Sequence, residues 1–420
     1  MAPSWVLLDR QVPFPHDPIV TKEEDVLVGL GCPPSDEEMM QTITRYLHTL
    51  KPDAHLVDPP NLSSLRMLPP MNTIPPLCSG VTSAHISSSD KNLVALYAGA
   101  YRPGTLSEGC YLIYDARKNS LSAIPKPPFD LSHDCIGRHS SALVVSDGEG
   151  EGYVLAELIR VRSSPDVAKA ALYLWRSSAT EWVVKAGRLP LEICQPIDDF
   201  SADMSFLSEG STLCWVDLFK GLLVCDLSRV LKNNSDPEFR FIPLPHVCPV
   251  YNVYTPEGRQ LRAEQFRSMS YVQGAIRFVT MDGYVKHQPG DDFELTVWTL
   301  SSDLSKWDQT SEYNVGKIWE NETHQAIGMP KISPSLPVLS MYEDAVVYLV
   351  FTDVRVVGCK LDYKGQYLLR VDMGNNKVQF YPGTTKWIHS PFMASDFSAY
   401  QKVSGEHPVL ILPLKRAPLA

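Results

Sequence analysis

The sequence lacks long hydrophobic runs and clusters of basic residues. No apolar stretch in its 420 residues approaches the roughly 20 that a membrane-spanning helix needs. The apolar run at Trp5–Leu8 is too short for the core of a secretory signal. The formal net charge of −10, with no run of Lys and Arg longer than two, disfavours binding to nucleic acid or anionic membranes. We therefore expect an intracellular protein of the cytoplasm or nucleus, not secreted, that binds neither nucleic acid nor membrane.

Paired cysteines are absent as well. The nine cysteines are odd in number, scattered, and free of CxxC spacing, which argues against a disulfide framework. Cys214 and Cys225 stand within strand-like runs, where a small buried hydrophobic side chain is the ordinary interpretation.

Proline, in contrast, is abundant, and most of the chain reads as short strands. The 34 prolines cluster after predicted strands, which argues against long helices. Five units of two hairpins recur, and the clearest lies between Met204 and Pro245. The first hairpins of the units span Val81–Ala100, Ser140–Ile159, Met204–Asp217, Ser268–Met281 and Pro337–Phe351. The second hairpins begin at Tyr111, Leu172, Leu222, Leu295 and Tyr367, and four of the five soon reach a proline.

These units predict an all-β fold. Their strands are apolar enough that each sheet must be covered on both faces, which radial stacking of sheets achieves. We expect a β-propeller-like domain over residues 77–390, with about five to six four-stranded blades. The alternative is a set of stacked β-sandwiches.

The terminal segments, residues 1–76 and 391–420, differ from the repeats. Ser35 and Glu38 resemble a capping box for a short helix ending near Pro52. Its apolar face packs on the β domain or, alternatively, binds a partner; that face comprises Met40, Ile43, Leu47 and Leu50. Pro59–Pro76 reads as an extended connector. Trp5–Leu8 and Val409–Leu412 are isolated strands, and one of them can complete a terminal blade.

Possible catalytic and metal-binding groups are few. His133, Cys135 and His139 form the tightest set of potential metal ligands, but their spacing matches no structural zinc site. Asp198, Asp199 and Asp203 could act as acid and base in glycoside hydrolysis, although adjacent aspartates more often cap turns. The sequence therefore predicts no catalytic, cofactor-binding or metal-binding residue and no cofactor.

Two further patterns favour structure over chemistry. The glycine-rich stretch Ser146–Gly152 lies between strands and carries two glutamates, so it predicts a hairpin turn instead of a phosphate loop. Six tryptophans recur within the repeats and are expected to pack between blades: Trp175, Trp182, Trp215, Trp298, Trp307 and Trp319.

Several strings carry a family resemblance. TLCWVDLFKGLLVCD at Thr212–Asp226, followed by FRFIPLP at Phe239–Pro245, resembles the plant family catalogued as domain of unknown function 1618, which is expanded in grasses. Weaker strings, among them WVLLDR, YVLAEL, LTVWTL and GMPKISPSLPVLS, extend the resemblance from Trp5 to about Pro382. It implies an intracellular plant protein and supplies no functional residues.

The sequence favours a non-enzymatic scaffold that binds a protein partner through exposed loops or a central mouth. The alternative is a carbohydrate- or small-molecule-active propeller that uses Asp198, Asp199 or Asp203. The oligomeric state is left open.

Overall fold

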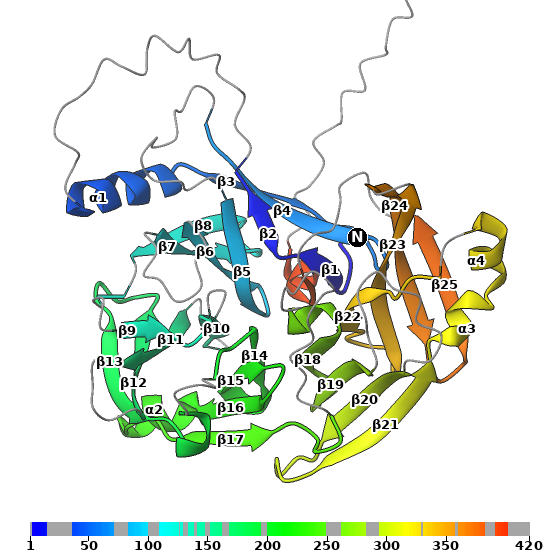
Figure 1. Ribbon diagram of the computed structural model, residues 1–420. Coiled ribbons are helices and arrows are strands. Elements are labelled where there is room, and N and C mark those ends of the chain that lie inside the picture. The colour runs from blue at the N-terminus through cyan, green and yellow to red at the C-terminus, as the bar shows by residue number, and fades with distance from the viewer. Residues whose placement is uncertain are drawn as a thin grey trace, which may run out of the picture.

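The strands are arranged as six sheets around a common centre (Figure 1). The computed structural model describes residues 2–14, 36–70, 83–99, 109–125, 127–128, 133–137, 141–147, 152–161, 168–194, 200–248, 262–282, 294–328, 331–357, 360–382 and 391–401. Each sheet has four or five strands, and the sheets stack face to face around the ring. The fold is a six-bladed β-propeller, which confirms the predicted fold class over stacked sandwiches.

The five predicted units form five of the six blades, and their hairpins fall where the sequence placed them. The first blade contains β5 (Ser83–Asp90), β6 (Leu93–Gly99), β7 (Gly109–Asp115) and β8 (Ser120–Pro125), with β2 (Gln11–Pro13) paired to β5. The second contains β10 (Leu143–Ser146), β11 (Tyr153–Val161), β12 (Lys169–Arg176) and β13 (Val183–Arg188), with β9 (His133–Cys135) beside β11.

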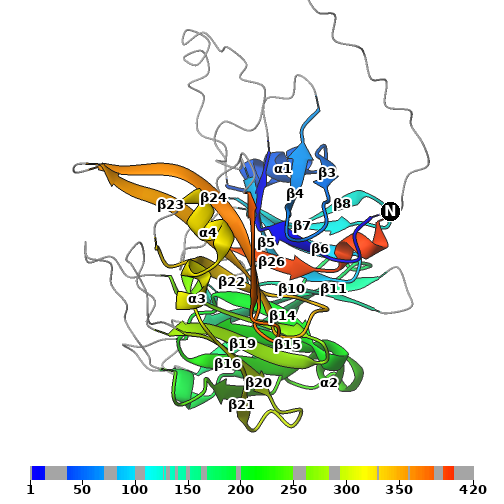
Figure 2. The ribbon, with the colours of Figure 1, turned by 90° about the vertical axis from the view of Figure 1, so that its right-hand side faces the viewer.

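The next three blades follow the same order from the centre outwards. The third comprises β14 (Met204–Ser208), β15 (Thr212–Asp217), β16 (Gly221–Asp226) and β17 (Phe239–Pro243). The fourth comprises β18 (Arg267–Val272), β19 (Ala275–Asp282), β20 (Glu294–Leu300) and β21 (Trp307–Asn314). The fifth comprises β22 (Ser335–Leu339), β23 (Val346–Val357), β24 (Lys360–Asp372) and β25 (Lys377–Pro382). From the side, β23 and β24 reach beyond the other strands (Figure 2).

The sixth blade closes the ring with strands from both ends of the chain. Its order is β26 (Phe392–Ser395), β1 (Val6–Asp9), β4 (Leu62–Leu68) and β3 (Lys51–His55). β1 pairs antiparallel with β26 and parallel with β4. β1 is thus the strand by which the N-terminal segment takes part in closing the ring.

Two details of the terminal segments differ from expectation. The C-terminal closing strand is β26, whereas Val409–Leu412 lies outside the described residues. Within the predicted connector Pro59–Pro76, β4 occupies Leu62–Leu68 and alternates buried with more exposed residues, as one covered face requires. The surrounding prolines hid this strand because they interrupt the pattern on both sides.

The predicted helix is present as α1 (Asp36–Leu47). Ile43, Leu47 and Leu50 are buried in the same apolar cluster as residues of the first and sixth blades, so the helix packs on the β domain. Ser35 and the side chain of Met40 lie outside what the structure describes. None of the helices in the described ranges has the length and hydrophobicity that crossing a bilayer requires.

Shorter helices occupy connections that the sequence left as loops. These are α2 (Leu227–Asn233), α3 (Gly316–Trp319) and α4 (Glu322–Ile327), with 3-10 turns at Leu191–Ile193, Glu209–Ser211, Ala263–Gln265 and Phe397–Tyr400. Asp226 caps α2 by accepting hydrogen bonds from the backbone N–H groups of Ser228 and Arg229.

Tryptophans join neighbouring blades, as expected. Trp215 is fully buried, and its indole N–H donates to the carbonyl of Ser141 at 2.9 Å. Trp182 and Trp307 are half-buried, and each donates at 2.9 Å to the carbonyl of a proline that ends the outer strand of the preceding blade, Pro125 and Pro243 respectively. The prolines that end these outer strands therefore accept hydrogen bonds that link neighbouring blades. Of the other tryptophans in the repeats, Trp175 and Trp319 are buried and Trp298 is half-buried.

A buried carboxylate links the first two blades. Glu157 on β11 has no exposed surface, and it accepts hydrogen bonds of 2.6 Å from the hydroxyls of Tyr111 and Ser141. Burial raises the pKa of Glu157 to about 7, although both hydrogen bonds act to lower it. The carbonyl of Ser141 also accepts from Trp215, so one polar network spans three blades.

Gly221, which opens β16, is expected to tolerate no side chain. Its φ is +156°, and an added Cβ would lie 2.2 Å from the carbonyl oxygen of Ile242 on β17. Gly221→Ala must therefore separate the two strands, and we expect it to lower the free energy of unfolding by about 1–3 kcal/mol in urea titrations. Gly365→Ala is the matched control, because its Cβ would meet nothing closer than 3.9 Å. Equal stability of the two variants would contradict this reading of the β16–β17 contact.

Candidate functional site

The residues weighed from the sequence do not converge on one site within the described ranges. Asp203 exposes 1% of its surface, and its Oδ2 accepts a hydrogen bond of 2.9 Å from the N–H of Leu218. That carboxylate therefore holds the turn between β15 and β16. Asp198 and Asp199 lie outside the described residues.

The histidine–cysteine set also yields no assembled centre. His133 and Cys135 belong to β9, and His139 lies outside the described residues. No group of three or more His, Cys, Asp or Glu side chains in the described ranges could hold a metal ion. Ser146 and Gly152 flank the turn between β10 and β11, as the sequence predicted for that stretch.

A cavity lies at the centre of the ring. It has a volume of about 380 Å³ and is bordered by the inner strands β5, β14, β18, β22 and β26, which belong to five different blades. Strands of several blades together form the wall of this cavity, and no single blade encloses it. It is therefore a natural place for a ligand that contacts the whole ring.

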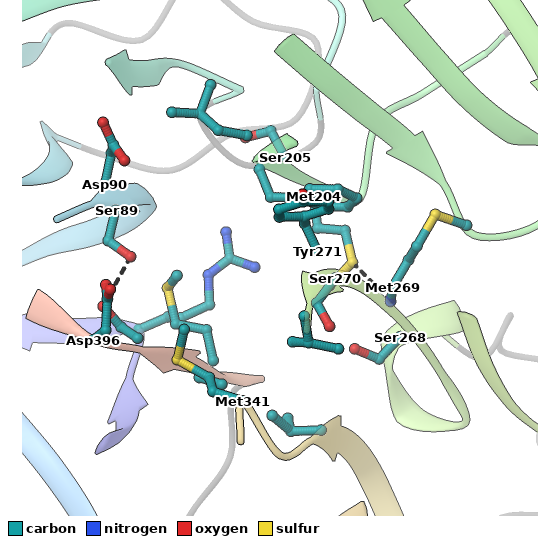
Figure 3. Close-up of a pocket in the computed structure, with 18 of the residues that line it drawn as sticks. Ser89, Asp90, Met204, Ser205, Ser268, Met269, Ser270, Tyr271, Met341 and Asp396 are labelled. Carbon is teal, nitrogen blue, oxygen red and sulfur yellow. Dashed lines mark hydrogen bonds between the residues drawn. The ribbon is translucent and has the colours of Figure 1, made fainter. Parts of the chain in front are cut away.

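A pair of carboxylates lies at one side of this cavity. Ser89 and Ser395 share a hydrogen bond of 2.9 Å between their hydroxyls, which ties the end of β5 to the end of β26. The residues that follow them are Asp90 and Asp396, and both line the cavity. Figure 3 shows Ser89, Asp90 and Asp396 together, across the cavity from Ser268 and Met269.

Both carboxylates are costly to ionise at this position. Burial raises the pKa of Asp90, against the lowering effects of a 2.7 Å hydrogen bond from the N–H of Ser146 and of the Lys91 ammonium. Burial also raises the pKa of Asp396, and the neighbouring charge of Asp90 raises it further. The two groups therefore share one electrostatic environment, in which added positive charge would be favourable.

Tyrosines border the acidic pair. Burial, followed by the charge of Asp396, raises the pKa of both Tyr342 and Tyr400, which places the two phenols within the influence of that carboxylate. Tyr342 is 57% exposed and meets the ring of Trp5 edge-on at 6.5 Å. Tyr400 faces the guanidinium of Arg117, which lies 5.1 Å from the ring centre.

Thioethers and hydroxyls contribute much of the remaining wall, beside apolar side chains such as Phe392. The methionines are Met204, Met269, Met341 and Met393, and the serines are Ser87, Ser89, Ser205, Ser268, Ser270 and Ser395. Methionine side chains are flexible and adapt to ligands of different shape. The hydroxyls of Ser205 and Ser270 are buried and make no hydrogen bond to any part of the chain that the structure describes.

A repeated dipeptide in the sequence could have indicated the acidic pair. A Ser-Asp dipeptide stands at the end of each of the inner strands β5, β10 and β26, with the aspartate inside β5 and just after β10 and β26: Ser89-Asp90, Ser146-Asp147 and Ser395-Asp396. β5 and β10 lie side by side with equivalent residues in contact. The N–H of Val144 donates to the hydroxyl of Ser88, and the N–H of Ser146 donates to the carboxylate of Asp90. Equivalent ends of inner strands therefore bring Ser-Asp pairs to one rim.

The fold is that of a β-propeller with a central cavity. Residues 215–348 of the chain, which include the string WVDLFKGLLVCD, match the family model described as a protein of unknown function (DUF1618). This match supports the resemblance to a domain of unknown function over part of the third blade, the fourth blade and part of the fifth. No curated protein matches the sequence.

Several solved structures are similar to this chain at very low identity. A GH43 β-1,3-galactosidase, BT3683, with galactodeoxynojirimycin is 12% identical over 72% of this chain and 95% of that chain, with a TM-score of 0.33. Polysaccharide lyase Uly1 is 12% identical over 70% and 71%, with a TM-score of 0.35. The β-propeller domain of the Trilobed protease from Pyrococcus furiosus is 10% identical over 71% and 70%, with a TM-score of 0.31. These values support no argument about the site.

Proposed function

We propose that this protein is a non-enzymatic interaction scaffold that binds a segment of a partner protein in its central mouth. Following the family resemblance and the sequence composition, we place it inside plant cells, in the cytoplasm or nucleus. The observation that carries the proposal is the cavity of about 380 Å³ shared by the inner strands of five blades. Its methionine and serine wall suits a side chain or short extended segment of a partner.

A cavity-filling variant tests the proposal. Ser270 lines the cavity and is half-buried, so Ser270→Phe occupies space that a ligand would need. Peptides selected on the immobilised protein from a display library are expected to bind this variant at least tenfold more weakly. Ser302→Phe is the matched control, because Ser302 is exposed in the turn after β20. Selected peptides that bind both variants equally, or a library that yields no binder, would contradict the proposal.

The alternative, a carbohydrate- or small-molecule-active propeller, has weaker support in the geometry. One oxygen of the Asp203 carboxylate is engaged by the N–H of Leu218, and Asp203 does not line the central cavity. A pair of carboxylates for glycoside hydrolysis needs two groups that face one substrate. On this hypothesis the chemistry would depend on Asp198 and Asp199.

A further inference from the structure

We propose that the central mouth recognises a primary ammonium group on an aliphatic stem, as in a lysine side chain of the partner, and binds it beside Asp90 and Asp396. This inference rests on the proposed function and names the chemical group that the mouth selects. Three features of the described residues support it: the arrangement of charge, the aromatic border and the apolar wall.

The charge arrangement favours a cation. The hydrogen bond between Ser89 and Ser395 holds Asp90 and Asp396 next to each other, and burial disfavours the ionised form of each. Lys91 is the cation that acts on both carboxylates, and one ammonium cannot neutralise two carboxylates. A second ammonium would relieve the repulsion between them and compensate the cost of burying charge.

The border of the site suits the same ligand. Tyr342 and Tyr400 lie under the influence of the Asp396 charge, and aromatic faces attract ammonium groups. Arg117 already lies over the ring of Tyr400, whereas the ring of Tyr342 is 57% exposed. Arg10, the other lining cation, donates to the carbonyl of Ile86 at 2.9 Å and so is held at β5.

The wall beyond the carboxylates suits an aliphatic stem. Met341, Phe392 and Met393 line the same cavity as the acidic pair, and they offer an apolar surface to a chain of methylenes. Ser205 and Ser270 line the same cavity, and their buried hydroxyls lack hydrogen-bond partners in the described part of the chain. An ammonium group on a flexible apolar stem supplies both a positive charge for the carboxylates and an apolar surface for the wall. An acidic group lacks the positive charge, and a purely apolar group supplies only the apolar surface.

Two small probes test the inference on the full chain. Nα-acetyl-lysine methylamide carries the stem and the ammonium group, and Nα-acetyl-norleucine methylamide has a closely similar stem without the charge. Titration followed by NMR is expected to show at least tenfold tighter binding of the lysine probe. Asp90→Asn and Asp396→Asn should each weaken that binding at least fivefold. Asp308→Asn, an exposed aspartate on β21, makes the same charge change away from the cavity and should leave binding within twofold.

The outcomes separate this inference from the proposed function. Equal binding of the two probes, or full binding by the Asp90→Asn and Asp396→Asn variants, would overturn the ammonium assignment. If the Ser270→Phe substitution still weakened the binding of display-selected peptides, the proposed interaction function would stand without the ammonium assignment. Residues 402–420 contain Lys402, Lys415 and Arg416 and follow Tyr400 at the cavity. If ending the chain at Gln401 raised the affinity for the lysine probe tenfold, the occupant would be the chain's own C-terminal segment, and the partner assignment would be wrong.

Discussion

Replacing Trp215 with alanine is expected to lower the free energy of unfolding by about 3–5 kcal/mol, the range for deleting a large core aromatic. Trp215 has no exposed surface and packs in the cluster between the second and third blades. Its ring meets that of Phe239 edge-on at 6.2 Å. The substitution would leave a cavity at this interface and remove the hydrogen bond to the carbonyl of Ser141. Urea unfolding of the purified protein, followed by circular dichroism, measures the loss.

Two further variants sharpen this measurement. Trp215→Phe keeps most of the apolar volume and loses the N–H donor, so its cost should fall well below that of alanine. Trp307→Ala removes a half-buried indole that makes an analogous hydrogen bond, to Pro243, and should also cost less. A loss below 1 kcal/mol for Trp215→Ala would mean that the blades do not pack through this residue.

Replacing Glu157 with glutamine is expected to stabilise the protein at pH 8 and to leave it nearly unchanged at pH 4.5. Burial raises the pKa of Glu157 from 4.5 to about 7, so between these values the folded state binds more protons than the unfolded state. The stability that this group contributes is therefore fully present below pH 4.5 and is lost as the pH rises towards 7. The loss amounts to about 3 kcal/mol. Glutamine is neutral throughout and can still bond to Tyr111 and Ser141.

The measurement is the free energy of unfolding as a function of pH. The difference between the Glu157→Gln variant and the unaltered protein should grow by up to about 3 kcal/mol from pH 4.5 to pH 8. Glu312→Gln, an exposed carboxylate on β21, is the matched control and should show no such trend. Parallel pH profiles for the Glu157 variant and the unaltered protein would show that the buried carboxylate does not change protonation across this range.

The blades could be predicted from the sequence because each one repeats the same local pattern. An apolar strand, a polar turn and a second apolar strand need no distant partner to be recognised, as the hairpin of β15 and β16 illustrates. The sixth blade could not be predicted in the same way. Its strands β1 and β26 pair across nearly the whole chain, and β4 is framed by prolines that mask its alternation. Pairing over such a separation leaves no local signal.

The candidate site was missed for a related reason. Asp90 and Asp396 stand in different blades, and each one alone reads as an ordinary turn residue after a strand. Only closure of the ring, with Ser89 bonded to Ser395, makes them neighbours. Asp203, which the sequence did single out, serves a turn through Leu218. Proximity in sequence was a poor guide here because the inner strands, not the loops of one blade, define the cavity.

Closure by strands from both ends also has a consequence for biosynthesis. β1 leaves the ribosome long before its antiparallel partner, β26, which begins at Phe392. Until that residue has emerged, β1 lacks this partner, and Leu7 lacks the neighbours from β22 to β24 with which it later packs. A nascent chain paused late in translation would hold a ring with one open side. Such a chain is a natural client for chaperones that bind exposed apolar strands, and its release from them should coincide with synthesis of the last blade.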